Sequence, residues 1–169
     1  SCFARLKHAE HTVRHDRQGA PDSATAATHY AYRGTVNVQH LVDTFMERAG
    51  MERIAERVET PLRGLRLACY YGCLITRPAK LTQAAHPEYP MKMDYLMRTL
   101  GAETIEWSAK TDCCGGSLGL TRTEVSVKMA KRILDEARAR GADAVVTMCP
   151  MCHLNLDARQ QRMGFAEPT

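Results

Sequence analysis

Cysteines are the residues of this sequence that are best suited to carry chemistry. The chain has 169 residues and seven cysteines, an odd number that does not close into internal disulfides. Nothing else in the sequence indicates an oxidising compartment, so thiolate ligands or redox groups are the better interpretation. The seven are Cys2, Cys69, Cys73, Cys113, Cys114, Cys149 and Cys152.

Two of these cysteines form the motif Cys149-Pro-Met-Cys152. Pro150 suits the first turn of a helix, so the motif is predicted at a helix N-terminus. Free backbone N–H groups and the positive end of the helix dipole favour a thiolate there, and any anionic cluster that it binds. Both sulfurs are then within reach of one metal centre.

A rarer motif is Cys113-Cys114-Gly115-Gly116. Adjacent side chains on an extended backbone point in different directions, so two neighbouring cysteines chelate one tetrahedral ion poorly. They are better placed to bind two metals of one cluster. Gly115 and Gly116 allow the backbone to turn close to a bulky inorganic core.

Cys73 brings the number of candidate ligands to five, which is one too many for tetrahedral zinc or a four-cysteine cubane. The number indicates either an expanded iron–sulfur centre or one spectator thiol. Cys149-Pro-Met-Cys152-His153 also matches the attachment motif of c-type haem, which leaves the Cys113–Cys114 pair unexplained. A thioredoxin-like redox pair, a structural zinc site and simple burial of the thiols are three further interpretations.

Each cysteine segment follows a predicted strand. Short runs with the composition of strands occupy residues 65–71, 103–107 and 144–148. The carboxyl ends of parallel strands meet at one edge of a sheet, where such sheets collect their ligand sites. The three cysteine segments are therefore expected to converge on one point.

Apolar residues at helical spacing predict helices over residues 91–100, 121–140 and 150–163. The second of these begins with a possible capping box, Thr121-x-x-Glu124. Strand and helix alternate, which predicts an α/β fold: a small, mainly parallel sheet with flanking helices and with cysteines at the carboxyl ends of its strands.

The amino-terminal part has a different character. A helical stretch is predicted over residues 38–58, and no complete sheet precedes it. Pro61 and Gly64 then interrupt the helical pattern. We therefore predict a helical amino-terminal segment over residues 1–62 and a second unit over residues 63–169.

The cysteine pattern resembles a known family. Cys73, Cys113-Cys114-Gly115 and Cys149-x-x-Cys152 together resemble the Cys-Cys-Gly cysteine-rich domain. Ala68-Cys-Tyr-Tyr-Gly-Cys73-Leu-Ile-Thr-Arg-Pro78 is similar to the B subunit of CoB–CoM heterodisulfide reductase. The similarity continues through Cys149-Pro-Met-Cys-His-Leu-Asn-Leu and back to Cys2-Phe-Ala-Arg-Leu-Lys, so it covers nearly the whole chain.

The resemblance implies a noncubane [4Fe-4S] cluster at each five-cysteine motif. In that family two such clusters attack a disulfide from either side. Cys2 resembles the last cysteine of the first motif, so residues 1–62 are expected to be a helical remnant of the first repeat with a connector. Residues 63–169 are the expected cluster-binding domain. Cys113 and Cys114 are the candidate catalytic residues, and the implied ligands are Cys73, Cys113, Cys114, Cys149 and Cys152.

The resemblance also implies a function and partners. The chain would be the iron–sulfur subunit of a heterodisulfide-reductase-like complex in the cytoplasm, passing electrons to the disulfide of small thiols or of a lipoyl carrier. A ferredoxin-like, iron–sulfur C subunit would be its immediate neighbour, with a flavin-containing A subunit further away. Two alternatives are an electron relay that binds a cluster without cleaving a bond, and a thioredoxin-like exchanger.

Several further residues have two interpretations. Arg77 follows Cys73 and would either offset the charge of a cluster or an acidic thiol substrate, or be an ordinary surface arginine. Lys110 is a weaker candidate for the same role. Cys69 has no place in the five-ligand pattern and is predicted to pack in the core. Core packing is also predicted for Met91, Met93 and Met97, and a solvated helix face, in preference to a metal site, for His8, His11 and His15.

Composition excludes several classes of function. The chain is 44% hydrophobic and 25% charged, which is typical of a globular protein. Its 23 basic and 19 acidic residues give a net charge of +4 with no basic run, so nucleic-acid binding is not expected. The longest uncharged apolar stretch that we find, residues 67–75, is shorter than the roughly 18 residues that a membrane span needs. Residues 1–15 carry charges where a signal peptide is apolar.

Overall fold

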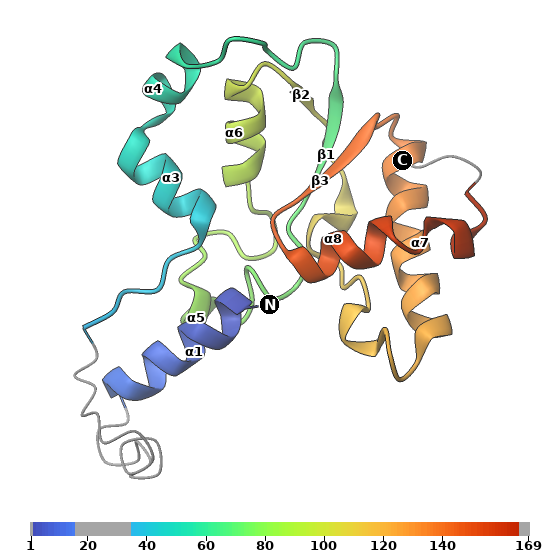
Figure 1. Cartoon of the computed structure of the whole chain (residues 1–169), viewed down its shortest axis with the longest axis horizontal. Helices are drawn as coiled ribbons and strands as arrows, with labels where there is room; N and C mark the ends of the chain where they lie inside the picture. Colours follow the sequence, from blue (N-terminus) through green and yellow to red (C-terminus); the bar gives the residue numbers. More distant parts are fainter. Residues whose placement is uncertain (1, 16–34, 166–169) are drawn as a thin grey trace.

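A three-stranded parallel sheet forms the centre of the chain. The structure is a computed structural model that describes residues 2–15 and 35–165 (Figure 1). Strands β1 (Arg66–Tyr70), β2 (Glu103–Thr104) and β3 (Ala144–Thr147) lie in the order β2-β1-β3. The predicted α/β fold with a small parallel sheet is therefore confirmed.

Helices cover both faces of this sheet (Figure 1). Helix α6 (Lys92–Thr99) packs on one face, with α3 (Leu41–Ala49) and α4 (Met51–Glu56) beyond it. The other face carries α7 (Thr123–Ala139) and α8 (Pro150–Asp157). Because successive side chains of a strand point to opposite faces, β1 contributes to two separate apolar clusters.

The first cluster joins β1 to α7 and α8 and includes Ala68, Tyr70 and Ile133. The second joins β1 to α6 and includes Cys69, Tyr71 and Met93. Cys69 is fully buried in the second cluster, as predicted from the sequence. Burial also raises the pKa of its thiol to about 12, so this cysteine is a packing residue.

The remaining elements lie outside the two helical layers. Helix α1 (Cys2–His15) lies against α5 (Ala79–Thr82). Three 3-10 helices complete the described part of the chain: η1 (Ser108–Thr111), η2 (Gly116–Leu118) and η3 (Gln160–Met163). Within the described ranges, no helix has both the length and the apolar character that crossing a membrane requires.

Helix α1 is fixed through its polar face. Lys7 and Glu10 are buried and form a 2.9 Å ion pair, and Glu10 also accepts a 3.2 Å hydrogen bond from the Val38 amide. The predicted solvated face consists of His8, His11 and His15, and all three are exposed on α1. His8, His11 and His15 do not join any metal-binding group among the described residues. Residues 16–34 of the predicted amino-terminal part lie outside the described residues.

The predicted strand over residues 103–107 is too long. Only Glu103–Thr104 is a strand, and the chain then turns inward so that Trp107 is buried. The indole N–H of Trp107 donates a 3.2 Å hydrogen bond to the carbonyl of Cys69. The edge strand therefore ends where the chain turns to bury the indole and to pair its N–H with a main-chain carbonyl.

The predicted capping box is wrong. Helix α7 begins at Thr123, with Arg122 in the N-cap position and no side-chain cap. Thr121 is exposed, and the Thr123 hydroxyl instead donates a 2.9 Å hydrogen bond to the carbonyl of Gly119. The turn that leaves η2 therefore extends two residues beyond the predicted start of the helix.

Two more of the predicted helices are interrupted. The stretch over residues 38–58 divides at Gly50, which has a φ of 78° and separates α3 from α4. The predicted final helix stops at Asp157, and the chain continues through η3 to Gly164. In contrast, the helix predicted after Pro90 ends as expected at Gly101, whose φ is 93°.

Candidate iron–sulfur site

The three cysteine segments leave the sheet at the same edge. Cys73 follows the end of β1, and Cys149 follows the end of β3 and precedes α8. Cys113 and Cys114 are reached from β2 through η1. This agrees with the expectation that parallel strands deliver the cysteines to one place.

The thiols form two groups of hydrogen-bonded neighbours. Cys73 bonds to Cys113 at the outer edge of the site, where Cys113 is exposed and Cys73 is half-buried. Cys152 bonds to both Cys114 and Cys149 in the interior, where all three are buried. All seven cysteines lie in the described part of the chain, and none of them forms a disulfide.

Tyr70 connects the two groups. Burial and the nearby thiols of Cys114, Cys152, Cys73 and Cys113 all raise the pKa of its hydroxyl, so these sulfurs surround one side chain. The hydroxyl donates a 2.6 Å hydrogen bond to the main-chain carbonyl of Asp112. Tyr70 therefore holds the double-cysteine segment against the end of β1, a role that the sequence did not predict.

Glycines leave room for sulfur at two places. Gly72 has a φ of 68°, and a Cβ atom there would lie 3.0 Å from the Cys152 sulfur. A Cβ atom on Gly116 would lie 3.4 Å from the Cys114 sulfur. Main chain and sulfur approach closely at both positions, as the Cys-Cys-Gly-Gly motif predicts for a segment that curves around a bulky group.

The thiols differ in their tendency to ionise. The hydrogen bond from Cys152 lowers the pKa of Cys149 to about 5, with further help from the backbone N–H groups of Cys152 and Met151 at the start of α8. The pKa of Cys114 is lowered to about 6, first by Cys152 and then by the Gly116 N–H and the Asn155 side chain.

Cys73 and Cys152 change in the opposite direction. Burial and then the neighbouring Cys113 raise the pKa of Cys73 to about 11. The pKa of Cys152 is also raised, by hydrogen bonding with its neighbours Cys114 and Cys149 and by burial. The site thus favours thiolates at two buried positions, and thiolate is the form that binds metal.

This donor set fits a polynuclear iron–sulfur group. The sulfurs are distributed over two groups from three segments, beside glycines that leave space. Soft thiolate donors in excess of four suit an iron–sulfur cluster better than a tetrahedral zinc ion.

Arg77 lies beside this site, but its bonds go to residues outside the thiol groups. Its guanidinium pairs with Glu88 and donates a 3.1 Å hydrogen bond to the Thr111 hydroxyl. The Glu88 contact, and to a smaller extent Cys73, raises the pKa of Arg77. Arg77 is therefore a half-exposed cation near Cys73 with a carboxylate partner of its own.

Lys110 has a structural role. It is 1% exposed and forms a 2.8 Å ion pair with Asp94, which is equally buried. Its carbonyl accepts hydrogen bonds from the N–H groups of Tyr71 and Gly72. Lys110 thus stabilises the turn before Cys73 through its main-chain carbonyl. The Asp94 carboxylate compensates the charge of its side chain.

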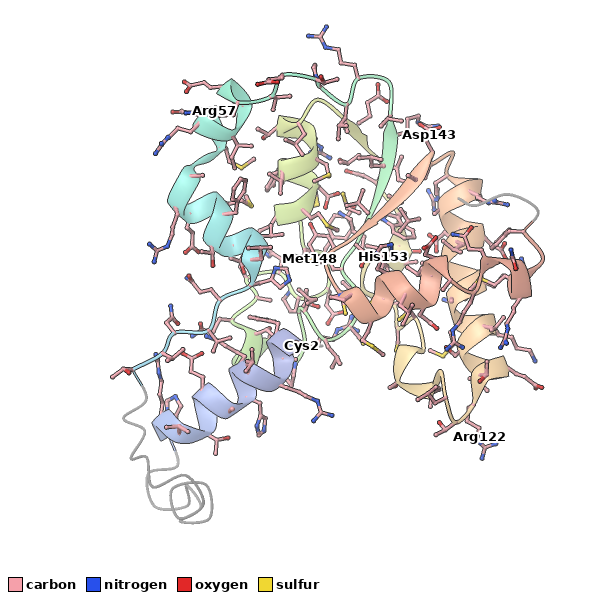
Figure 2. All side chains as sticks on the ribbon, in the orientation of Figure 1. Cys2, Arg57, Arg122, Asp143, Met148 and His153 are labelled. Carbon is pink, nitrogen blue, oxygen red and sulfur yellow. The ribbon has the colours of Figure 1, made fainter. Side chains whose placement is uncertain are left out.

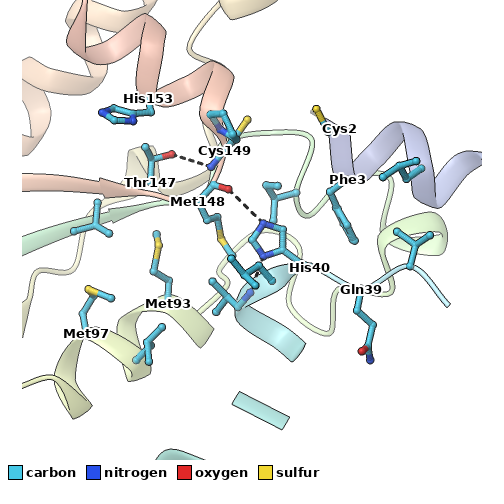
Figure 3. A pocket seen from close by; sticks show the side chains of 18 residues that line it. Cys2, Phe3, Gln39, His40, Met93, Met97, Thr147, Met148, Cys149 and His153 are labelled. Carbon is cyan, nitrogen blue, oxygen red and sulfur yellow. Dashed lines mark hydrogen bonds between the residues drawn. The ribbon is translucent and has the colours of Figure 1, made fainter. Parts of the chain in front are cut away.

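An apolar cavity of about 680 Å³ opens beside the buried cysteines. Cys2 and Cys149 lie at one end of it, while Met93 and Met97 line the opposite end (Figure 3). Met148 and His153, which also line it, flank Cys149 where β3 joins α8 (Figure 2). The cavity could hold an apolar molecule within reach of Cys149.

His40 is a polar side chain of the amino-terminal part that lines this cavity (Figure 3). Its Nε2 is 3.3 Å from the carbonyl oxygen of Met148, and its Nδ1 accepts from the Val42 amide. The ring also packs edge-on against Phe3. His40 therefore caps α3 and attaches it to the segment that carries Cys149, which sequence analysis missed.

Comparison with known proteins identifies the class of this chain. The model of the CCG cysteine-rich domain family matches residues 67–157, which contain Cys73, Cys113, Cys114, Cys149 and Cys152. The chain belongs to this family. Its resemblance to the B subunit of heterodisulfide reductase is confirmed as well, by the relatives that it matches.

The B subunit of ferredoxin:CoB-CoM heterodisulfide reductase from Methanosarcina mazei is 29% identical over 94% of this chain and 54% of its own length. A protein from Archaeoglobus profundus that is named for its likeness to the same B subunit is 27% identical, over 96% of this chain and 56% of its own. The membrane anchor subunit of 8-methylmenaquinol:fumarate reductase from Wolinella succinogenes is 27% identical, over 95% and 56% respectively. The chain thus spans about half the length of these relatives. The first and third of these relatives are named as subunits of reductases.

Proposed function

We propose that the chain binds a noncubane [4Fe-4S] cluster and transfers electrons to a disulfide substrate as a subunit of a heterodisulfide-reductase-like complex. The observation that supports this proposal is that thiols from three segments lie in two groups, Cys73 with Cys113 and Cys152 with Cys114 and Cys149. Cys113 and Cys114 are the proposed catalytic residues, and the proposed ligands are Cys73, Cys113, Cys114, Cys149 and Cys152. The similarity to the B subunit of heterodisulfide reductase supports both assignments.

When bound, such a cluster stores electrons and supplies them one at a time. Cleaving a disulfide consumes two electrons and two protons and gives two thiols. The apolar cavity beside Cys149 suits the apolar part of such a substrate. The buried thiolates would ligate the iron, and the N–H groups at the start of α8 would stabilise the negative charge of the thiolate-bound cluster.

The electrons would come from partner subunits. We propose an iron–sulfur C subunit in the role of immediate electron donor and a flavin-containing A subunit further along the series of carriers, as the resemblance implies. Arg77, which is half-exposed at the edge next to Cys73, is a proposed contact for an acidic substrate or for the cluster charge.

Iron and acid-labile sulfide analysis under anaerobic conditions tests the proposal. We expect about four irons and about four sulfides per chain for a [4Fe-4S] centre. The reconstituted protein should also show the paramagnetic signal of an iron–sulfur centre after redox adjustment. One zinc per chain without sulfide would reject the proposal.

A second candidate is an electron relay that binds the cluster but does not cleave a disulfide. The similarity to a subunit of 8-methylmenaquinol:fumarate reductase favours it, since the name of that complex includes no disulfide. The two functions differ in their response to substrate. A disulfide reductase, reduced and freed of excess reductant, is expected to be reoxidised by a thiol–disulfide pair, measured by its visible absorption. A relay shows no such response to any disulfide tested.

A further inference from the structure

Asn155 connects two of the cysteine segments. It lies on α8 and is 3% exposed. Its side-chain amide donates a 2.5 Å hydrogen bond to the main-chain carbonyl of Cys114. Its Oδ1 atom accepts a 3.0 Å hydrogen bond from the hydroxyl of Ser126 on α7. Because a main-chain carbonyl can only accept, these two partners fix the orientation of the amide.

The same amide also acts on the sulfur. Hydrogen bonding by Asn155 lowers the pKa of the Cys114 thiol, as does hydrogen bonding by Cys152. Cys152 and Asn155 are three residues apart and therefore share one face of α8. Helix α8 thus contacts Cys114 through two side chains. One is the thiol of Cys152, which is a proposed ligand, and the other is the amide of Asn155, which is not.

The contact with α7 leaves little freedom. Ser126 is fully buried, and its Cα atom would lie 3.0 Å from a Cβ atom on Gly115. Gly115 has a φ of 73°. The turn that follows Cys113 and Cys114 therefore packs closely against α7 at this residue, where a side chain would not fit. The network of Ser126, Asn155 and Cys114 is buried and hydrogen-bonded throughout, which is the condition under which such a network fixes one geometry.

We propose that Asn155 is a positioning residue for Cys114 and that its hydrogen bond raises the reduction potential of the cluster bound there. The proposal rests on the proposed function, because it concerns a bound cluster. Hydrogen bonds to ligand sulfurs help to set the potentials of iron–sulfur centres. A donor at the sulfur stabilises the reduced state, which is the more negative one, so losing the donor disfavours reduction.

A redox titration followed by paramagnetic resonance tests this on the anaerobically reconstituted chain. Asn155→Asp keeps the shape of the side chain but replaces the donor by a carboxylate. The equilibrium constant for one-electron reduction is expected to fall about tenfold or more, which corresponds to about 59 mV towards more negative potential. Asn37→Asp is the matched control, since Asn37 is exposed, and it should leave the potential unchanged.

A second variant covers the case in which Asn155→Asp fails to bind a cluster. Ser126→Ala keeps the amide but removes the donor to its Oδ1 atom, so we expect wild-type iron content and a smaller shift in the same direction. Wild-type potential and spectrum in Ser126→Ala, or in a loaded Asn155→Asp, would overturn the role of Asn155 and leave the proposed function intact. Wild-type protein without iron and sulfide would instead contradict the proposed function.

Discussion

Replacing Cys114 by serine is expected to lower the bound iron from about four to fewer than about one per chain, with acid-labile sulfide falling in parallel. Cys114 is buried, and hydrogen bonding by Cys152 and Asn155 lowers the pKa of its thiol to about 6. The lowered pKa favours the thiolate. A serine hydroxyl at this position is a harder and far less acidic donor, so it does not substitute for the thiolate.

Cys69→Ala is the matched control. Cys69 is also buried, but it lies in the apolar cluster on the opposite face of β1, with Met93. We expect this variant to keep its iron and sulfide and to lose only about 1 kcal/mol of stability. Equal loss of iron in both variants would mean that the cluster is lost through unfolding, which circular dichroism and the melting temperature would show.

The same approach separates this function from thiol–disulfide exchange. An exchanger that uses Cys149 and Cys152 would be active without metal, would lose activity in Cys149→Ser and would retain it in Cys113→Ser. The proposed cluster predicts loss of iron in both variants. Metal-free activity that survives Cys113→Ser would therefore contradict it.

The sequence was sufficient to predict where the cysteines meet. Strands before Cys73 and Cys149 are marked by apolar and β-branched residues, and the topology of a parallel sheet brings the segments after its strands to one edge. The glycines after Cys114 also indicated a close approach of main chain and sulfur, which Gly116 shows. These features depend on local composition and on topology alone.

The missed features depend on contacts between distant segments. Asn155 stands at a helical spacing from Cys152, which is a signal, but its acceptor on Cys114 is 41 residues away. His40 meets the carbonyl of Met148 across 108 residues. Nothing local distinguishes these two side chains from ordinary surface residues, so only the folded chain shows their roles.

Lys110 illustrates the same limit. Lysine is mostly exposed in folded proteins, so its position near Cys113 suggested a charge for the cluster. Its actual partner is Asp94, on helix α6, which precedes Lys110 in the chain. Burial of both groups could not be deduced, because it depends on how α6 packs against η1.

Replacing Lys110 by methionine is expected to destabilise the chain by about 3–5 kcal/mol, because it leaves Asp94 as a buried charge without its cation. Tyr71 would remain, donating a 2.7 Å hydrogen bond to Asp94, but one hydroxyl does not replace an ammonium group. For a chain of this length the melting temperature should fall by roughly 6–20 °C. Urea unfolding followed by circular dichroism gives the free energy directly.

A double replacement tests whether the cause is the unpaired charge. Lys110→Met combined with Asp94→Asn removes both charges, so its loss of stability should be smaller than the sum of the two single losses. Lys131→Met breaks the exposed pair of Lys131 with Asp135 and should cost less than about 1 kcal/mol.

If Lys110 instead served to balance the cluster charge, Lys110→Met would leave the stability of the metal-free chain unchanged and shift only the reduction potential of the loaded one. That result would refute the structural role, because breaking the buried 2.8 Å ion pair with Asp94 must then cost no stability.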